Sequence, residues 1–268
     1  MSRLFALGSG SRGNAFAIEC EGAVLVLDAG FSLRELDKRA ERVGLDLAGL
    51  VGVALTHEHG DHATGAVRLA ARHGVPVLSS AGTWSALGAG DTITFLEVVQ
   101  GVRRDLGPFA VTGCPIPHDA AEPLALAVAA RDGTSVGLAY DLGRPTTAVR
   151  YLLRNLTAVI LEANHDEVLL RTSDYPVSVQ ARIAGSAGHL SNRIAAELLA
   201  EVHHRGLGAV MLAHLSRRCN TEVAARATVE SALRAVGFTG DVLVARQDEP
   251  TGPITLAHAS GSQFSLTL

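Results

Sequence analysis

The sequence predicts an α/β protein that forms a single domain over residues 1–268. Short apolar runs rich in β-branched residues alternate with segments of helical periodicity, the pattern of strands and helices packed on each other. Hydrophobic residues make up 47% of the chain and charged residues 19%, which is typical of a globular protein with a substantial core. No linker rich in proline, glycine or serine divides the sequence, so we expect one domain.

The expected elements follow a clear order along the chain. The first part is rich in strands joined by tight turns, so part of the sheet should be antiparallel. In the later part strands alternate with helices, which favours helices outside packed sheets. We expect strands at 16–20, 23–27, 51–55, 75–78, 124–129, 135–140, 158–161, 209–213 and 242–245. We expect helices at 33–43, 63–73, 146–153, 191–204 and 222–236.

Composition excludes several classes of protein. No apolar run approaches the roughly 20 residues that span a bilayer, and the N-terminus lacks the apolar region of a signal peptide. Three widely spaced cysteines, Cys20, Cys114 and Cys219, argue against a disulfide framework and fit a reducing compartment. We therefore expect a cytoplasmic protein without a membrane partner, and the oligomeric state, a homo-oligomer included, stays open. The net charge of −4 gives no strongly basic footprint, but a cleft that holds divalent cations is locally positive.

A glycine-rich stretch near the N-terminus matches a dinucleotide-binding pattern only superficially. The segment Gly-Ser-Gly-Ser-Arg-Gly begins at Gly8, and Asp28 follows at nearly the spacing of a ribose-binding acid. The pattern requires a helix after the third glycine, whereas the next residues read as a strand. We therefore expect a tight turn between strands. A weaker interpretation is that Ser9, Ser11 and Asn14 line a cleft and contact phosphate oxygens.

The densest cluster of candidate ligands is the sequence Thr-His-Glu-His-Gly-Asp-His, which ends at His62 and follows an apolar run. A helical His-Glu-x-x-His site is excluded because Asp61, not histidine, stands four positions after His57. In an extended backbone His57 and His59 share a side, and the glycine allows a bend that turns Asp61 and His62 toward a second ion. Such mixed ligands suit zinc, manganese or iron. A solvated turn that caps a helix is the alternative, but it leaves three histidines unexplained.

Three later residues can complete a site for two ions. Asp141 and His214 stand at the ends of expected strands, and His118 follows the segment Gly-Cys-Pro-Ile-Pro. A carboxylate such as that of Asp141 has two oxygens and can bridge two ions. Each residue alone has an ordinary explanation, as a core histidine or a helix N-cap. Polar residues that repeatedly follow apolar strands are less easily explained in that way.

The pattern Thr-His-x-His-x-Asp-His with later His, Asp and His resembles the metallo-β-lactamase fold superfamily over nearly the whole chain. The resemblance implies an αβ/βα four-layer sandwich with two central mixed sheets and a dinuclear metal centre at one edge. It also implies that Asp28 is a supporting aspartate behind the ligands, although a turn cap explains this residue equally well. On the superfamily pattern the first ion has the ligands His57, His59 and His118, the second has Asp61, His62 and His214, and Asp141 bridges them.

The C-terminal third of the sequence indicates which branch of the superfamily the chain resembles. The segment Gly-His-Leu-Ser-Asn around His189, and His-Leu-Ser at His214, are similar to the branch that contains RNase Z. In that branch a histidine matched by His189 assists the reaction, and a glutamate matched by Glu162 positions it. The further segments Gly-Ser-Gly-Ser-Arg-Gly-Asn and Leu-Glu-Ala-Asn-His-Asp resemble the YycJ (WalJ) family of metallo-hydrolases, regarded as DNA exonucleases acting in DNA repair.

The resemblance and the chemistry together predict a metal-dependent phosphodiesterase on nucleic acid, most simply a DNA exonuclease. Two divalent ions, zinc or manganese first and iron as a further option, would lie about 3.5–4 Å apart and convert a bridging water to the hydroxide nucleophile. Asp61 would orient the hydroxide, and His189, held by Glu162, would protonate the leaving group. Candidate substrate contacts are Asn164, His165 and Arg217, with Arg171 and Arg218 as further arginines and Trp84 as a stacking residue.

Two other functions stay open at this point. The first is hydrolysis of a small ester, thioester or cyclic phosphodiester on the same metal centre, which the modest net charge would suit. The second is a non-catalytic metal-binding or scaffolding protein of the same fold. The presence of Asp61 and His189 weighs against the scaffold.

Overall fold

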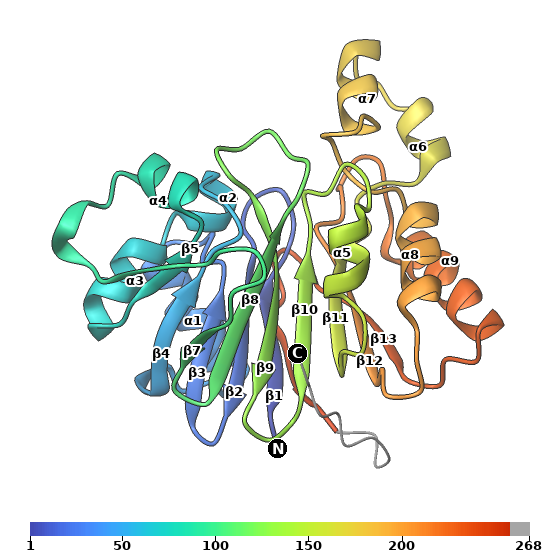
Figure 1. Ribbon diagram of the computed structural model, residues 1–268. Coiled ribbons are helices and arrows are strands. Elements are labelled where there is room, and N and C mark those ends of the chain that lie inside the picture. Colours follow the sequence, from blue (N-terminus) through green and yellow to red (C-terminus); the bar gives the residue numbers. More distant parts are fainter. Residues whose placement is uncertain (258–268) are drawn as a thin grey trace.

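Two seven-stranded mixed sheets form the centre of the molecule in a computed structural model, which describes residues 1–257 (Figure 1). The first sheet has, in spatial order, the strands β14 (Thr251–Thr255), β1 (Arg3–Gly8), β2 (Ala15–Cys20), β3 (Ala23–Leu27), β4 (Leu50–Ala54), β5 (Val77–Ser79) and β6 (Phe95–Glu97). The second sheet has the strands β13 (Asp241–Val244), β12 (Ala209–Ala213), β11 (Ala158–Glu162), β10 (Ser135–Ala139), β9 (Leu124–Ala130), β8 (Phe109–Pro115) and β7 (Arg104–Leu106).

Each sheet combines antiparallel hairpins with parallel crossovers. Strands β1, β2 and β3 pair antiparallel, whereas β3, β4, β5 and β6 pair parallel. The second sheet repeats this scheme, with β7 to β10 antiparallel and β10 to β13 parallel. The mixture follows from the connections, because tight turns join antiparallel strands and helical segments join parallel ones.

Helices cover the outer face of each sheet and complete four layers (Figure 1). On the first sheet lie α1 (Leu33–Arg42) and α3 (Ala66–His73), and α2 (Gly60–Ala63) and α4 (Ala81–Leu87) lie near its upper edge. On the second sheet lie α5 (Thr147–Leu152), α8 (Asn192–Val202) and α9 (Glu222–Ala235). The helices α6 (Glu167–Arg171) and α7 (Val177–Ile183) project beyond the sheets, and two 3₁₀ turns lie at Leu47–Gly49 and Gly90–Thr92.

Three apolar cores hold these layers together. Side chains from the inner faces of both sheets, such as Phe16, Leu126 and Ile160, form the central core. A second core joins the second sheet to α5, α8 and α9, and a third joins the first sheet to α1 and α3. Since each sheet buries both faces, its strands are almost continuously apolar.

The structure confirms the four-layer sandwich that the family resemblance implied. The nine expected strands, and four of the five expected helices, lie within two residues of their expected bounds. The expected helix at 63–73 is instead divided into α2 and α3. The division lies at Gly65, where the backbone approaches the loop between β3 and α1 so closely that a Cβ atom would come 2.3 Å from the carbonyl oxygen of Phe31.

Three site residues directly follow strands in an unusual backbone conformation. Asp28 after β3, Asp141 two residues after β10 and His214 after β12 have φ angles of 53°, 52° and 55°. Residues other than glycine rarely adopt this left-handed region, and each such residue costs about 1–3 kcal/mol. Strained positions of this kind gather at functional sites.

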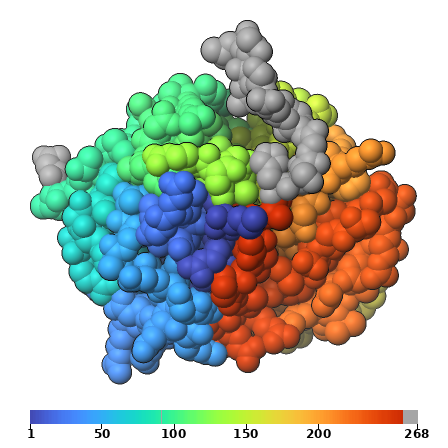
Figure 2. All heavy atoms as spheres, turned by 90° about the horizontal axis from the view of Figure 1, so that it is seen from below, coloured from blue at the N-terminus to red at the C-terminus, as the bar shows by residue number. Residues whose placement is uncertain are grey.

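The first and the last described strands are neighbours at one edge of the first sheet. There the N-terminal strand β1 lies beside β14, to which it pairs antiparallel (Figure 2). Among residues 1–257, no helix is both long enough and apolar enough to cross a membrane.

Candidate metal centre

The C-terminal ends of strands from both sheets bring the candidate ligands to one edge of the sandwich. His57 and His59 lie on the loop between β4 and α2, and His59 is the N-cap of that short helix. In the second sheet β8, β10 and β12 run in the same direction, so the residues that follow them meet at the same edge. Those residues include the candidates His118, Asp141 and His214.

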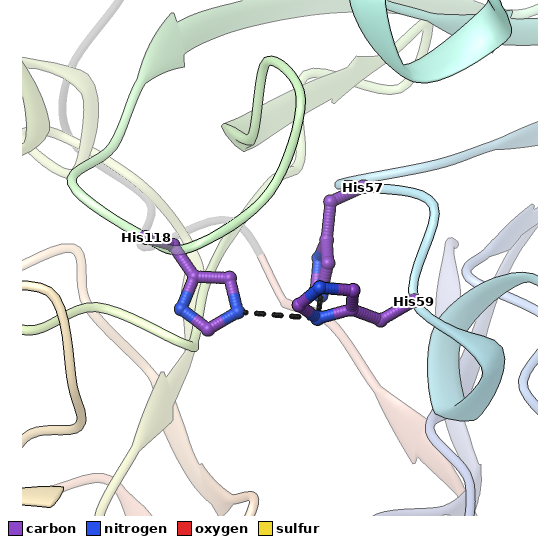
Figure 3. Close-up of side chains that lie close together, drawn as sticks. All are labelled: His57, His59 and His118. Atoms are coloured by element: carbon purple, nitrogen blue, oxygen red, sulfur yellow. Dashed lines mark hydrogen bonds between the residues drawn. The ribbon is translucent and has the colours of Figure 1, made fainter. Parts of the chain in front are cut away.

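His57, His59 and His118, here called the first triad, point toward one another (Figure 3). Nε2 of His57 lies 3.1 Å from Nδ1 of His59, and Nε2 of His118 lies 3.3 Å from the same atom. His57 is fully buried, whereas the other two are partly exposed. Three ring nitrogens at one point form a suitable set of ligand atoms for a cation.

Asp61, His62 and His214, here called the second triad, converge beside the first. Oδ2 of Asp61 lies 3.4 Å from Nε2 of His62 and 3.6 Å from Nε2 of His214. Asp141 lies between the triads, because its Oδ2 is 3.6 Å from Nε2 of His57 and 2.9 Å from Nε2 of His62. A single oxygen therefore faces both ligand sets.

The donor atoms of these residues fit divalent cations. Oδ2 of Asp141 and Nε2 of His214 are buried and have no hydrogen-bond partner among the described residues. A buried polar atom without a partner costs free energy, and a cation between the triads would remove this cost for both atoms. Imidazole nitrogens and carboxylate oxygens together are a donor set that zinc and manganese accept.

Asp28 supports both triads from behind. The fully buried carboxylate accepts hydrogen bonds from the backbone N–H of Thr56 (2.8 Å), from the Thr56 hydroxyl (2.7 Å) and from the hydroxyl of Tyr140. Its Oδ2 lies 2.7 Å from Nδ1 of His62, and the Thr56 hydroxyl lies 3.0 Å from Nδ1 of His57. These contacts orient two ligand rings so that their Nε2 atoms face the centre.

The loop at 8–14 contacts every member of the second triad. The Ser9 hydroxyl accepts a hydrogen bond from the backbone N–H of His214 (2.8 Å) and donates one to Oδ1 of Asn14 (2.7 Å). The backbone N–H of Asn14 donates to the carbonyl oxygen of Asp61 (2.7 Å), and its Nδ2 lies 3.2 Å from Nε2 of His62. Asn14 is fully buried, so these contacts support a positioning role, and a phosphate contact by Ser9 or Asn14 stays a prediction.

Glu162 links the second triad to His189. The buried carboxylate lies 2.6 Å from Nδ1 of His189 and 3.2 Å from Nδ1 of His214, and it accepts backbone hydrogen bonds from Leu142 and Leu190. Nδ1 of His189 also lies 3.2 Å from Asp141. Since Nδ1 is occupied in this way, Nε2 is the ring atom that His189 has free to interact with a bound molecule.

Burial and neighbouring charges determine the ionisation of the site. Burial, reinforced by repulsion from His62, lowers the pKa of His57 to about 2, so this imidazole is neutral and has a lone pair for a cation. Burial disfavours the charged form of His189, but attraction to Glu162 and hydrogen bonds overcome this and raise its pKa to about 10. Burial would raise the pKa of Glu162, but the charge of His189 lowers it to about 2.

The remaining candidates for substrate contact differ in burial and in hydrogen-bond partners. The buried amide of Asn164 donates to the carbonyl oxygen of His214 (2.9 Å). His165 is 2% exposed, and its Nδ1 has no partner among the described residues. Arg217 pairs with Asp248 in an exposed position, and Ser11 is exposed on its loop. Substrate contacts by these four residues stay predictions.

Three further candidates have contacts of their own. Trp84 stacks on Phe95 with ring centroids 5.0 Å apart and packs on the third core. Arg218 pairs with Asp174 and lies over the ring of Tyr175, and Arg171 is exposed on α6.

Thr56 and Tyr140 are contributors to which the sequence analysis assigned no role. Each directly precedes a candidate ligand and ends an apolar run. A hydroxyl group at that position is therefore the one feature of the sequence that could have indicated their supporting role. Their hydroxyls are buried against Asp28, and only the folded chain brings these three residues together.

Comparisons of the sequence and of the fold with known proteins point to the same family. Residues 24–215 match the beta-lactamase superfamily domain. The chain is 30% identical to exodeoxyribonuclease YycJ of Bacillus anthracis over 94% of this chain and 97% of that protein. It is 29% identical to exodeoxyribonuclease WalJ of Streptococcus pneumoniae serotype 2 over 85% and 86% of the two chains. The metallo-beta-lactamase fold protein YhfI from Bacillus subtilis superposes with a TM-score of 0.71 at 17% identity, over 94% of this chain and all of that one.

Proposed function

This chain belongs to the metallo-β-lactamase superfamily and is a hydrolase of that fold, and from this premise we propose that it is a metal-dependent DNA exonuclease. The observation that carries the proposal is that both triads converge around the carboxylate of Asp141. Nδ1 of His189 lies 3.2 Å from the same carboxylate. The two relatives named as exodeoxyribonucleases, aligned over most of their length, support DNA as the substrate.

The proposal assigns ion-binding roles to the converging side chains. The first triad would hold one ion, the second triad another, and Oδ2 of Asp141 would contact both. When bound, divalent ions of this kind make water nucleophilic near neutral pH and stabilise negative charge on a phosphate oxygen. Zinc or manganese is the expected metal, with iron as a further option.

The chain's own residues would orient the substrate and move protons. Asp61 is 28% exposed at the mouth of the cluster, where its carboxylate can orient the nucleophile. Nδ1 of His189 is bound by Glu162, so Nε2 would deliver a proton to the oxygen that leaves phosphorus. Glu162 holds the ring in that orientation and favours its protonated form.

Digestion of end-labelled DNA by the purified protein with Mn²⁺ or Zn²⁺ tests the proposal. We expect shortening from an end, and a loss of at least about 100-fold in the Asp61→Ala and His189→Ala variants, the range for removal of a general acid or base. Asp105→Ala, on an exposed position of β7, and His73→Ala, on a partly exposed position of α3, are matched controls and should retain activity. Turnover of lactones or thioesters with every oligonucleotide intact would show that the nuclease assignment is wrong.

Elemental analysis of the protein before any metal is added tests the cofactor separately. We expect about two divalent ions per chain for a dinuclear centre. A cytoplasmic location and a role in DNA repair are part of the same proposal. Tight DNA binding without hydrolysis under any metal would instead favour a scaffold.

A further inference from the structure

A cavity of about 530 Å³ opens directly beside the second triad. Ser9, whose hydroxyl accepts the backbone N–H of His214, lines it, as do Leu215 and Ser216, which follow that ligand in the chain. The start of α9 and the segment at 244–249 form the rest of its wall. The volume lies within the range of about 300–1,000 Å³ typical of small-molecule sites. The cavity and the candidate metal centre therefore share Ser9 as a common wall.

Two arginines converge on the carboxylate of Asp248, which lines this cavity together with one of them, Arg217. Asp248 pairs with Arg12 (2.7 Å) from the loop at 8–14 and with Arg217 from the segment after β12. Arg12 is further fixed because its backbone N–H donates to Oε1 of Gln247 (2.7 Å). The three charged side chains are 48–63% exposed. Two elements that are distant in sequence thus present their guanidinium groups at a single point.

Two guanidinium groups that lie this close together can bind a phosphate group. A guanidinium group forms paired hydrogen bonds with phosphate oxygens as readily as with a carboxylate. An exposed ion pair contributes only about 0–1 kcal/mol, so an incoming phosphate can replace Asp248 at little cost. The other arginine of the cavity, Arg246, is held between Glu222 (2.9 Å) and Glu249 (2.7 Å). The two glutamates beside Arg246 would repel an anion. An anion is therefore favoured on the side of the cavity where Arg12 and Arg217 lie.

We propose that this cavity binds a nucleotide adjacent to the one that is hydrolysed, and that Arg12 and Arg217 exchange Asp248 for its phosphate. The inference rests on the proposed function and adds a second phosphate position to it. The aliphatic side chains of Leu215 and Val244 offer apolar surface to the uncharged sugar and base. Asp248 acts as an internal competitor that occupies the arginines until DNA arrives.

Binding of a phosphorothioate oligonucleotide that resists hydrolysis tests this inference at several salt concentrations. We expect Asp248→Asn to bind several-fold more tightly, because the competitor is neutralised. We expect the double variant Arg12→Ala/Arg217→Ala to bind more weakly, with the slope of log Kd against log salt reduced by about 1, since one phosphate loses its partners. All three side chains are exposed, so these variants should fold.

A matched pair controls for the change in net charge. Asp37 is 44% exposed and pairs with Arg72 through two short contacts on α1 and α3, so Asp37→Asn removes the same charge elsewhere. We expect wild-type DNA affinity from Asp37→Asn. If Asp37→Asn tightens binding as much as Asp248→Asn, or if neither the Asp248 variant nor the double arginine variant differs from wild type, the cavity is not a phosphate site. In those cases the nuclease assignment stands as long as wild-type protein degrades DNA, whereas failure of the wild type to degrade any DNA overturns that assignment separately.

Discussion

The two triads use similar side chains but are supported very differently. The second triad is buried at His62 and His214. Asp28, Ser9 and Glu162 accept hydrogen bonds from its histidines, and the backbone N–H of Asn14 donates one to Asp61. In the first triad, as far as residues 1–257 go, only His57 has a supporting partner outside the ligand set, the Thr56 hydroxyl, and His59 and His118 are partly exposed. Neighbouring groups hold the second set in position, whereas the first depends mainly on its own loops.

This difference predicts unequal ion affinities. Ligands that neighbouring groups already orient lose little conformational freedom when an ion binds, and partners of this kind commonly change metal affinity by about 10- to 100-fold. We therefore expect the second triad to retain its ion when the first triad has lost the other. Gradual chelation followed by elemental analysis should show a plateau near one ion per chain.

The largest effect is expected from Asp28→Ala, which removes the support that both triads share. Thr56, Tyr140 and His62 would lose their acceptor in a fully buried position. Each unpaired buried donor costs about 1–3 kcal/mol, so the free energy of unfolding should fall by more than about 3 kcal/mol. Denaturant unfolding measures this loss, with the exposed Asp105→Ala as control. An unfolding curve like that of wild type would contradict the role assigned to Asp28.

The next effect is expected from His118→Ala, which breaks the first triad alone. The variant should contain about one ion per chain instead of two and should lose nuclease activity by more than the 10- to 100-fold typical of supporting residues. The stability should change little, because His118 is partly exposed. Elemental analysis of the variant after dialysis checks the expectation. Retention of both ions would show that His118 is not a ligand.

A smaller and more selective effect is expected from Asn14→Ala, which acts on the second triad. The hydrogen bond from Ser9 and the amide contact near His62 would be lost, while the backbone bond to Asp61 would remain. We expect affinity for one ion to fall by about 10- to 100-fold and affinity for the other to be unchanged. Metal titration by calorimetry separates the two. A drop in DNA affinity with unchanged metal binding would instead support the phosphate contact predicted from sequence.

The smallest effect is expected from Glu58→Ala, on the side of the first triad. Its carboxylate accepts the backbone N–H of Ala121 (2.7 Å) and so ties the loop that contains His118 to the histidine cluster. Loss of one such hydrogen bond at a partly exposed position should reduce stability by about 1 kcal/mol. Affinity for the less tightly held ion should fall a few-fold. Thermal unfolding with and without metal measures both, and an effect as large as that of Asn14→Ala would remove the distinction between the triads.

The two triads also differ in how far the sequence predicted them. The apolar strands and the histidine cluster are local patterns, so the α/β class and the candidate ligands could be predicted from them, whereas the four-layer sandwich and the division of the ligands into two sets followed from the family resemblance. The partners of the second triad come from a loop near the N-terminus and from β11, and no local pattern connects Ser9 with His214. The glycines of the segment at 8–14 predict a tight turn. They do not predict the buried hydrogen bonds of Ser9 and Asn14, which form only in the folded chain.

Five strands were not among those expected, namely β1, β6, β7, β8 and β14, and for β1 and β8 the reason is related. β1 runs directly into the glycine loop, and β8 contains Gly113 and ends at Pro115, residues that normally interrupt strands. Both are held by neighbours on each side, β2 and β14 for the first and β7 and β9 for the second. Tertiary pairing therefore overrides local preference at these positions. The roles of the individual site residues, and the assignment of residues 1–268 to one domain, stay predictions.

The left-handed backbone at Asp28, Asp141 and His214 lowers the stability of the fold at three residues of the candidate metal centre. Glycine adopts that conformation freely, so Asp141→Gly should relieve part of the local strain while removing the carboxylate that lies between the triads. Selection for thermal stability alone would then favour replacement of these three residues of the candidate metal centre. Engineering a hardier form of this protein should therefore leave them untouched and seek its gains on the outer helices.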